Sequence, residues 1–381
     1  KKKKAFTFMT RKLILNTRRI LGNESRTKSV VDSAVLKGID IFDCGGSQQV
    51  QRLPKVKKRI IAKIGYYERD ESVFESIQGA RLLSDSLGHC LEPSFIEAET
   101  QRLQELTQIP PIILLHHPET ADGTWRQALD RLFSMRRAGL DLHAIGVASG
   151  DVAWLRSNTN DLLRFGASVL RLPACALDSP QIRDDTAELG RQFELVGIRP
   201  LLSTTPVHMQ LVDHPNTEGV DRGATQRAYF SACEAIVQHL TPPEDADEDT
   251  RAGADWLLQL VADLNESVTK MTPSAWEYEL STQIGPMIHN KFDGLDDQTA
   301  DLLFKFFQNY GKLVSITAQD CARAAAASPP TGVLPIKPDQ PLAEWALRHV
   351  FHQRPELTYI SLAVESTNDI DVALRVAASS S

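Results

Sequence analysis

Short apolar runs alternate with longer amphipathic stretches along most of this chain. In the stretches 125–135 and 178–195, apolar residues recur three and four positions apart, which predicts helices. The runs between such stretches have the length of strands, and their near-continuous hydrophobicity predicts parallel strands that are buried on both faces. The expected strands are 13–15, 39–42, 60–64, 112–115, 144–147, 169–172, 200–202 and 359–362.

This alternation predicts an α/β protein of the TIM (β/α)8 barrel class. An open doubly wound sheet is the alternative, but it would place a glycine-rich phosphate-binding turn after the first strand, and the sequence has none there. The alternation stops before the last β/α unit, which predicts a helical insertion with helices at 226–240, 253–268 and 299–313 and an acidic, proline-led loop at 242–249. The predicted parts are a basic N-terminal arm with the first strand (1–24), barrel units (25–206), the helical insertion (207–341) and the final barrel unit (342–381).

Composition narrows the class of protein. The chain has 381 residues, of which 42% are hydrophobic, so it is long enough for a sizeable core. Its net charge of −7 argues against a general nucleic-acid-binding protein. Five scattered cysteines predict neither a disulfide framework nor a zinc site, so we expect no metal and a reducing intracellular compartment. No apolar run reaches the roughly 20 residues of a membrane span.

The N-terminal end is unusually basic. Residues 1–19 include eight positive side chains, and the first acidic residue is Glu24. Such a segment is typical of the remainder of a mitochondrial presequence, or of an arm that binds an anionic partner such as RNA or lipid. A solvated leader is the alternative interpretation. We therefore expect an intracellular protein, with the mitochondrion suspected and the cytoplasm as the alternative.

Several segments in chain order resemble motifs of the aldo-keto reductase superfamily. The Lys-x-Gly-x-Tyr spacing that begins at Lys63, and the segment 364–366, are most similar to the L-galactose and D-arabinose dehydrogenase branch. The resemblance implies a (β/α)8 barrel that reduces a carbonyl group with NAD(P)H. The five resembling segments are 34–43, 61–65, 113–119, 145–147 and 342–348.

The resemblance also implies a catalytic set at the carboxyl ends of the strands. In the family a tyrosine protonates the carbonyl oxygen, a lysine lowers the pKa of that tyrosine, an aspartate pairs with the lysine, and a histidine orients the carbonyl. Asp43, Lys63 and His116 match three of these positions. The tyrosine position holds Gln48, and no tyrosine occurs between Asp43 and Lys63. An amide cannot serve as the proton donor.

Other interpretations of these residues stay open. Tyr66 and Tyr67 follow the third strand and are candidates to replace the missing acid. Asp43 and Lys63 are alternatively a structural ion pair at the mouth of the barrel, and His116 a turn histidine that bonds to backbone.

The expected cofactor positions also depart from the family pattern. The two positions of the Ser-Asn pair that holds the nicotinamide amide in the family are occupied here by Ala148 and Ser149. Arg171 stands where a glutamine is expected. In the phosphate-binding loop, Glu365 would repel a 2′-phosphate, which argues against NADP more than against NAD. Ser366 and Thr367 are candidates to cap the last helix and to bind one phosphate there. We therefore expect no cofactor, or NAD(P)H if the pocket survives.

Two functions remain after this reasoning. In the first, the barrel has lost catalysis and serves as a structural or interaction subunit, with a large mitochondrial assembly as one expected host. Its protein partners would bind through the insertion 207–341. In the second, the chain is a divergent NAD(P)H-dependent oxidoreductase that reduces a sugar or a small aldehyde.

Overall fold

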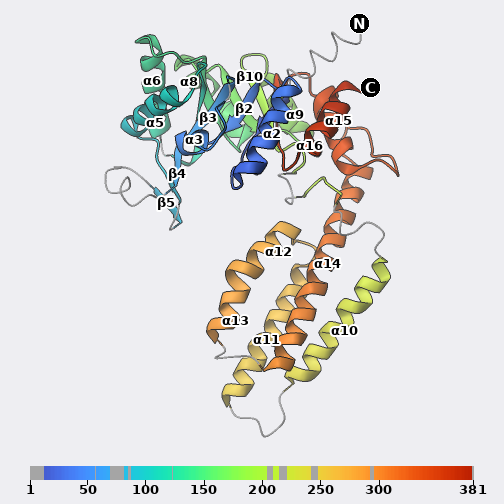
Figure 1. Ribbon diagram of the computed structural model, residues 1–381. Coiled ribbons are helices and arrows are strands. Elements are labelled where there is room, and N and C mark those ends of the chain that lie inside the picture. Colours follow the sequence, from blue (N-terminus) through green and yellow to red (C-terminus); the bar gives the residue numbers. More distant parts are fainter. Residues whose placement is uncertain are drawn as a thin grey trace. The chain divides into compact units, whose positions relative to one another are not determined.

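The chain forms two compact units, which are described separately (Figure 1). The barrel unit comprises the described residues of 1–201, 330–334 and 344–381, and the helical unit those of 202–329 and 335–343. The computed structural model describes residues 13–55, 57–68, 81–84, 87–121, 123–203, 209–213, 221–241, 248–291 and 296–379. Most of the predicted basic arm, residues 1–12, therefore lies outside the described residues.

The barrel unit is built on a closed sheet of parallel strands, as the alternation of the sequence predicts. Around the barrel the strands follow the order β1-β11-β10-β9-β8-β7-β3-β2. This order confirms the predicted TIM (β/α)8 barrel. The strands are β1 (Leu13–Asn16), β2 (Ile41–Cys44), β3 (Arg59–Ile64), β7 (Ile112–His116), β8 (Ala144–Ala148), β9 (Val169–Pro173), β10 (Glu194–Ile198) and β11 (Tyr359–Ala363).

Side chains alternate between the two faces of each strand, so the barrel has two apolar layers. Ile14, Ile61 and Leu114 belong to the cluster that fills the interior. Their neighbours, such as Leu15 and Phe42, pack outward against the surrounding helices. These helices are α2 (Glu24–Leu36), α3 (Ser47–Gln51), α5 (Pro93–Leu106), α6 (Thr124–Arg137), α7 (Val152–Ser157), α8 (Thr159–Arg164), α9 (Pro180–Leu189), α15 (Leu342–Gln353) and α16 (Thr367–Ala378).

One strand lies at a different place from the predicted one. The strand expected at 200–202 is wrong, because β10 spans Glu194–Ile198 and the helix expected up to 195 ends at Leu189. Pro200 has no N–H for the ladder, so a proline in a central strand is unfavourable. The correct strand contains Gly197, which interrupts the apolar run and weakens its signal in the sequence.

A small antiparallel sheet follows β3, which the sequence pattern did not predict. It has the order β4-β6-β5, with β4 at Tyr66–Glu68, β5 at Arg81–Ser84 and β6 at Leu87–His89. The three strands are only three or four residues long, too short for a clear period of two. This sheet brings Tyr66 next to histidines of the barrel unit.

The helical unit confirms the three helices expected in the insertion, each of which begins earlier than expected and the last of which extends well beyond its expected end. Its aromatic core includes Tyr229, Trp276, Phe306 and Tyr310. The last two residues of the predicted acidic loop, 248 and 249, are helical in α11, and 242–247 lie outside the described residues. No described helix is long and apolar enough to cross a membrane. The helices are α10 (Arg222–Leu240), α11 (Glu248–Ser267), α12 (Pro273–Glu279), α13 (Gly285–Lys291) and α14 (Asp297–Ala327), with a π-helical turn at Leu280–Ile284.

Candidate functional site

The carboxyl ends of the strands carry a buried polar cluster in the barrel interior. Asp43 is the second residue after Ile41 on β2, and Lys63 the second after Ile61 on β3, so both share the inner face of their strands. Arg171 on β9 and Ser361 on β11 reach the same cluster. All four side chains are buried. The structure therefore brings together two of the three predicted catalytic residues and one of the predicted cofactor residues.

Asp43 is the centre of this cluster. Its Oδ1 accepts a hydrogen bond from Lys63 Nζ. Its Oδ2 accepts one from Arg171 Nε at 2.9 Å, one from Asn16 Nδ2 at 3.1 Å and one from Ser361 Oγ. Burial raises the pKa of the Asp43 carboxyl, but the charges of Arg171 and Lys63 and these hydrogen bonds outweigh burial and hold the pKa below its usual range. Asp43 is therefore ionised, and both of its oxygens are occupied.

Arg171 reaches Asp43 across the barrel. In the closed strand order, β9 lies four places from β2, which is the opposite wall of an eight-stranded barrel. An arginine is long enough to span such an interior, and its guanidinium is a strong partner for a carboxylate. Arg171, which stands at the position predicted to contact a nicotinamide, thus forms an internal ion pair with Asp43.

The pKa of Lys63 is affected by Arg171, the second cation of the cluster. Burial and the charge of Arg171 lower its pKa from 10.5 to about 8, while Asp43 acts in the opposite direction. Its ammonium donates to Asp43, and no phenol among the described residues accepts a hydrogen bond from it. The lysine that would make a tyrosine more acidic is instead part of a cluster with two cations and one carboxylate.

The Arg171→Gln variant tests this electrostatic coupling. Removal of the nearby positive charge favours the ammonium form, so the pKa of Lys63 is expected to rise from about 8 toward 10.5. The measurement is an NMR titration of protein with 13C-labelled lysine, with the signal assigned by a Lys63→Met variant. Arg164→Gln, which changes an exposed arginine on α8, is the control and is expected to leave the titration unchanged. A Lys63 pKa that stays or falls in Arg171→Gln contradicts the coupling.

His116 ends β7 among other aromatic rings. Its ring meets that of Tyr66 edge to face, with centroids 4.8 Å apart, and stacks on His117 at 4.6 Å. His89 Nε2 lies 2.8 Å from the carbonyl oxygen of His116. Burial, followed by the charges of Lys63 and Arg171, holds the pKa of His116 well below its usual value. The imidazole is therefore neutral near pH 7.

The tyrosine position is occupied by an amide that makes a structural contact. Gln48 lies on the short helix α3, and its Oε1 accepts a hydrogen bond from the backbone N–H of Glu68 at 3.2 Å. The side chain thus fastens α3 to β4. This contact gives Gln48 a structural role and supplies no proton donor to the barrel interior.

The two candidate replacement tyrosines point to opposite sides of β4. Burial and the charge of Glu119 raise the pKa of Tyr66, and Lys63 is not among the charges that act on it. Tyr67 is buried, with its ring 5.6 Å from that of Phe95. The phenol nearest to His116 is therefore a weaker acid than free tyrosine, which is the opposite of what general acid catalysis needs.

Two of the predicted cofactor residues outside the interior, Ser149 and Ser366, have hydrogen-bond partners within the chain. Ser149 is buried, and its Oγ accepts a hydrogen bond from the N–H of Asp151 at 2.9 Å. Ser366 is the N-cap of α16, as expected, whereas Thr367 is the first residue of the helix. Glu365 forms an exposed ion pair with Arg19 at 3.0 Å.

The N-terminus of α16 already binds a carboxylate of this chain. Asp369 Oδ2 accepts the N–H groups of Glu365 at 2.7 Å and Ser366 at 3.0 Å. Ser366 is the N-cap, so its N–H is one of the amide groups at this helix end that have no partner within the helix and that a phosphate could use. Asp369 was missed in the sequence, although a serine followed three residues later by an acid is the pattern of a capping box. A phosphate that used the Ser366 N–H would have to displace this carboxylate.

The described residues contain no group of three or more histidine, cysteine, aspartate or glutamate side chains that could hold a metal ion. The paired histidines His116 and His117 contact each other and Tyr66, and Nδ1 of His117 lies 2.7 Å from Glu119 Oε1.

Comparison with known proteins identifies the fold. Neither the protein-family models nor the curated proteins give a match to the chain. Its structure is similar to that of an aldo-keto reductase from Bacillus halodurans in its holo form, with 10% sequence identity, coverage of 97% of this chain and 87% of that chain, and a TM-score of 0.50. The glycerol dehydrogenase from Gluconobacter oxydans is also similar, with 12% identity, coverage of 96% and 86%, and a TM-score of 0.47. The similarity to the Bacillus halodurans structure confirms the resemblance to aldo-keto reductases at the level of the fold.

Proposed function

We propose that this aldo-keto-reductase-like barrel does not reduce carbonyl groups and that it serves as a structural or interaction subunit. The observation that carries the proposal is the ion pair between Arg171 and Asp43 across the barrel. This pair divides the Asp43 carboxylate between Lys63 and Arg171, and it fixes a buried guanidinium at the position where the family has a glutamine. With Gln48 in the tyrosine position, Lys63 has no phenol to activate.

One further feature supports the loss of cofactor binding. Asp369 accepts the N–H of Ser366 at the N-terminus of α16, so a phosphate would have to compete there with a carboxylate that is covalently part of the chain. Glu365 leaves no uncompensated negative charge beside this helix end, because Arg19 and Arg26 lie 3.0 and 3.7 Å from its carboxylate oxygens.

The proposed partner surface is on the helical unit. Three aromatic side chains there are largely exposed: Phe230 by 60% on α10, Tyr278 by 63% on α12 and Phe304 by 65% on α14. Aromatic residues are enriched in protein interfaces, where their burial contributes much of the binding energy. We assign the insertion to a protein partner and the basic N-terminal arm to an anionic partner, RNA or lipid. A large mitochondrial assembly is the proposed host.

Calorimetric titration with NADPH and with NADH tests the loss of catalysis. We expect no binding heat up to millimolar cofactor for the wild-type protein, and no carbonyl reduction for the Gln48→Tyr variant, because Arg171 and Asp369 still occupy their sites. An active aldo-keto reductase titrated under the same conditions is the positive control. Micromolar binding of either cofactor would instead support the alternative function, an NAD(P)H-dependent oxidoreductase. The proposed subunit role requires that the native protein is part of a complex larger than the free chain. A native size equal to that of the free chain would contradict this role.

A further inference from the structure

The amino-terminal end of the barrel, opposite the end that holds the Asp43 cluster, contains a cavity of about 390 Å³. The volume lies in the range of small-molecule sites. Four neighbouring strands, β11, β1, β2 and β3, each contribute their first residue to its wall. These residues are Tyr359, Leu13, Ile41 and Arg59. The wall therefore combines an aromatic ring and aliphatic side chains with a cation.

Positive charges outnumber negative ones in the cavity wall. Lys57, Lys58 and Arg59 line it together with one carboxylate, Asp40. Asp40 pairs with Lys58 at 2.7 Å, whereas Lys57 and Arg59 form no ion pair with a described carboxylate. Lys57 is exposed, so its ammonium is accessible to a ligand. The wall thus favours an anion.

One further acid acts on this wall without cancelling the excess. Burial and the charge of Glu194, the first residue of β10, raise the pKa of Tyr359, while Arg59 acts in the opposite direction. Lys55, which is exposed in the segment before β3, supplies another cation. Lys55 and the three cations of the wall therefore face two carboxylates at this end of the barrel.

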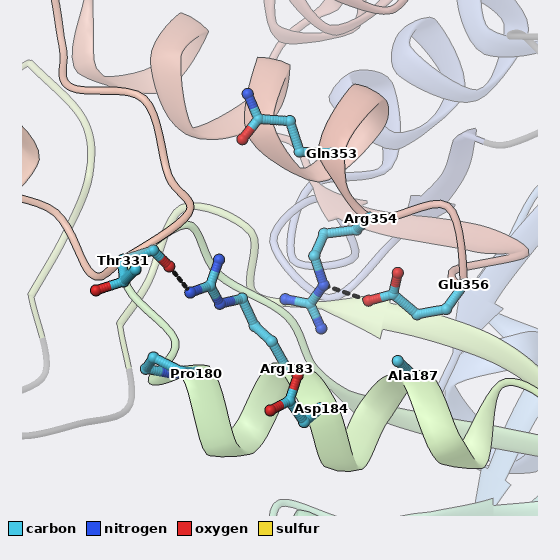
Figure 2. A pocket seen from close by; sticks show the side chains of 8 residues that line it. All are labelled: Pro180, Arg183, Asp184, Ala187, Thr331, Gln353, Arg354 and Glu356. Atoms are coloured by element: carbon cyan, nitrogen blue, oxygen red, sulfur yellow. Dashed lines mark hydrogen bonds and ion pairs between the residues drawn. The ribbon is translucent and has the colours of Figure 1, made fainter.

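The larger cavity of the barrel unit shows what balanced charges look like. It measures about 560 Å³ and lies between α9 and the residues that follow α15 (Figure 2). Arg183 and Arg354 share its wall with Asp184 and Glu356, and Arg354 also pairs with Asp178 at 3.1 Å. That cavity has no excess charge to select an anion, in contrast to the cavity at the amino-terminal end.

The basic N-terminal arm joins the barrel at the cavity of the amino-terminal end. Residues 1–12 contain six cations and no acid, and residue 12 is bonded to Leu13 in the cavity wall. Although the net charge of the whole chain is −7, its cations are thus concentrated where the arm meets this cavity. Such segregation of charge is typical of a surface that binds a polyanion.

The shape and lining of the cavity favour a nucleic acid over a lipid surface. Proteins bind single-stranded nucleic acids through cations that contact phosphates and aromatic rings that contact bases, and Lys57 and Tyr359 offer both in one cavity. The bases of single-stranded RNA are free to enter such a cavity, whereas those of a duplex are paired and stacked. A bilayer presents a continuous surface, which would meet only the rim.

We propose that this cavity binds one nucleotide of single-stranded RNA and that the RNA continues along the basic arm. The base packs on Tyr359, and the phosphate contacts the ammonium of Lys57. This inference rests on the proposed anionic partner of the arm and names it as RNA. It uses no residue of the Asp43 cluster, so cofactor binding would contradict the loss of catalysis and leave the RNA site standing. Conversely, absence of RNA binding would refute this site alone.

Fluorescence anisotropy with the full chain compares a labelled oligouridylate with the same sugar–phosphate chain without bases. We expect the wild type to bind the oligouridylate at least about fivefold more tightly, the lower limit for one stacked base. Tyr359→Leu removes the ring and is expected to abolish this preference, whereas Tyr359→Phe retains the ring and the preference. Equal binding of the two chains by the wild type, or a preference that survives in Tyr359→Leu, would refute a base in the cavity.

The Lys57→Gln variant tests the phosphate contact. Affinity for a single strand falls with salt in proportion to the number of phosphates contacted, so the slope of log affinity against log salt is expected to decrease by about 0.7. Lys270→Gln changes an exposed lysine just beyond α11 and is the matched control, with the wild-type slope expected. An unchanged slope in Lys57→Gln would leave the arm as the whole RNA site and refute the cavity.

Vesicles of phosphatidylserine and phosphatidylcholine distinguish RNA from lipid. At equal phosphate concentration they are expected not to displace the oligouridylate from the wild-type protein. Displacement that is lost in Lys57→Gln would assign this end of the barrel to a lipid surface and overturn the assignment to RNA.

Discussion

Replacement of Asp43 with asparagine is expected to lower the free energy of unfolding by about 3–5 kcal/mol, the cost of a buried ion pair that loses one partner. Asp43 is fully buried and is the counter-ion of both Lys63 and Arg171. An amide in its place leaves two cations in the barrel interior without a negative charge. Urea denaturation of the two proteins, followed by circular dichroism, measures the difference.

The control for Asp43→Asn is the same substitution in an exposed ion pair. Asp161 pairs with Arg126 at 2.7 Å on the surface of the barrel unit, and Asp161→Asn is expected to cost less than about 1 kcal/mol. Asp43→Asn combined with Arg171→Gln removes one of the two stranded cations and should recover part of the loss. An Asp43→Asn cost no larger than that of Asp161→Asn would show that the cluster does not depend on this carboxylate.

The pH dependence of stability follows from the same carboxylate. Its pKa is lower in the folded protein than the ordinary 3.8, so its contribution is present above that value and is lost as the pH falls through the folded pKa. Lys63 changes stability in the same direction, but in alkaline solution. Its folded pKa of about 8 lies below 10.5, so the unfolded chain binds the proton more tightly and this group makes stability rise with pH across that interval.

The inner position of this cluster could be predicted from the sequence, but its hydrogen bonds could not. Because side chains alternate along a strand, Asp43 shares the inner face of β2 with Ile41, two residues before it. By the same rule Asn16 shares the inner face of β1 with Ile14. That Arg171 bonds to Asp43 depends on which strands face each other across the closed barrel. Strand order and stagger arise from the packing of all eight strands, and a single sequence does not contain a local signal for them.

The errors in the predicted elements have local causes. Gly197 divides the apolar residues of β10, because an added side chain at that position would meet Leu357 and Ala174 at 2.9 and 3.0 Å. The apolar residues after Pro200 therefore match the pattern of a buried strand better than the residues of β10 do. In the helical unit, α12 and α13 were missed because each has seven residues, too few for the helical period to stand out.

Gly146 is the residue whose substitution is expected to have the largest effect in the barrel. It lies in the middle of β8, in the Ile-Gly-Val segment on which the resemblance to aldo-keto reductases partly rests. A Cβ at this position would lie 1.8 Å from the carbonyl oxygen of Val169 on the neighbouring strand β9. The glycine thus allows a close approach of two strand backbones, a reason for glycine that no composition or pattern reveals.

Gly146→Ala is expected to cost more than about 4 kcal/mol, because the clash is between two backbones and no flexible side chain can move away. Bonds on either side fix the two strands, from Ser168 N to the carbonyl of Ile145 at 2.9 Å and from Ser149 N to that of Arg171 at 3.0 Å. Soluble yield and urea denaturation measure the loss. Gly150→Ala is the matched control just beyond β8: its added Cβ would be 3.5 Å from His117 Cε1, an ordinary contact, and near wild-type stability is expected. Equal stability of the two variants would mean that β8 and β9 can separate by more than an ångström without loss of the barrel.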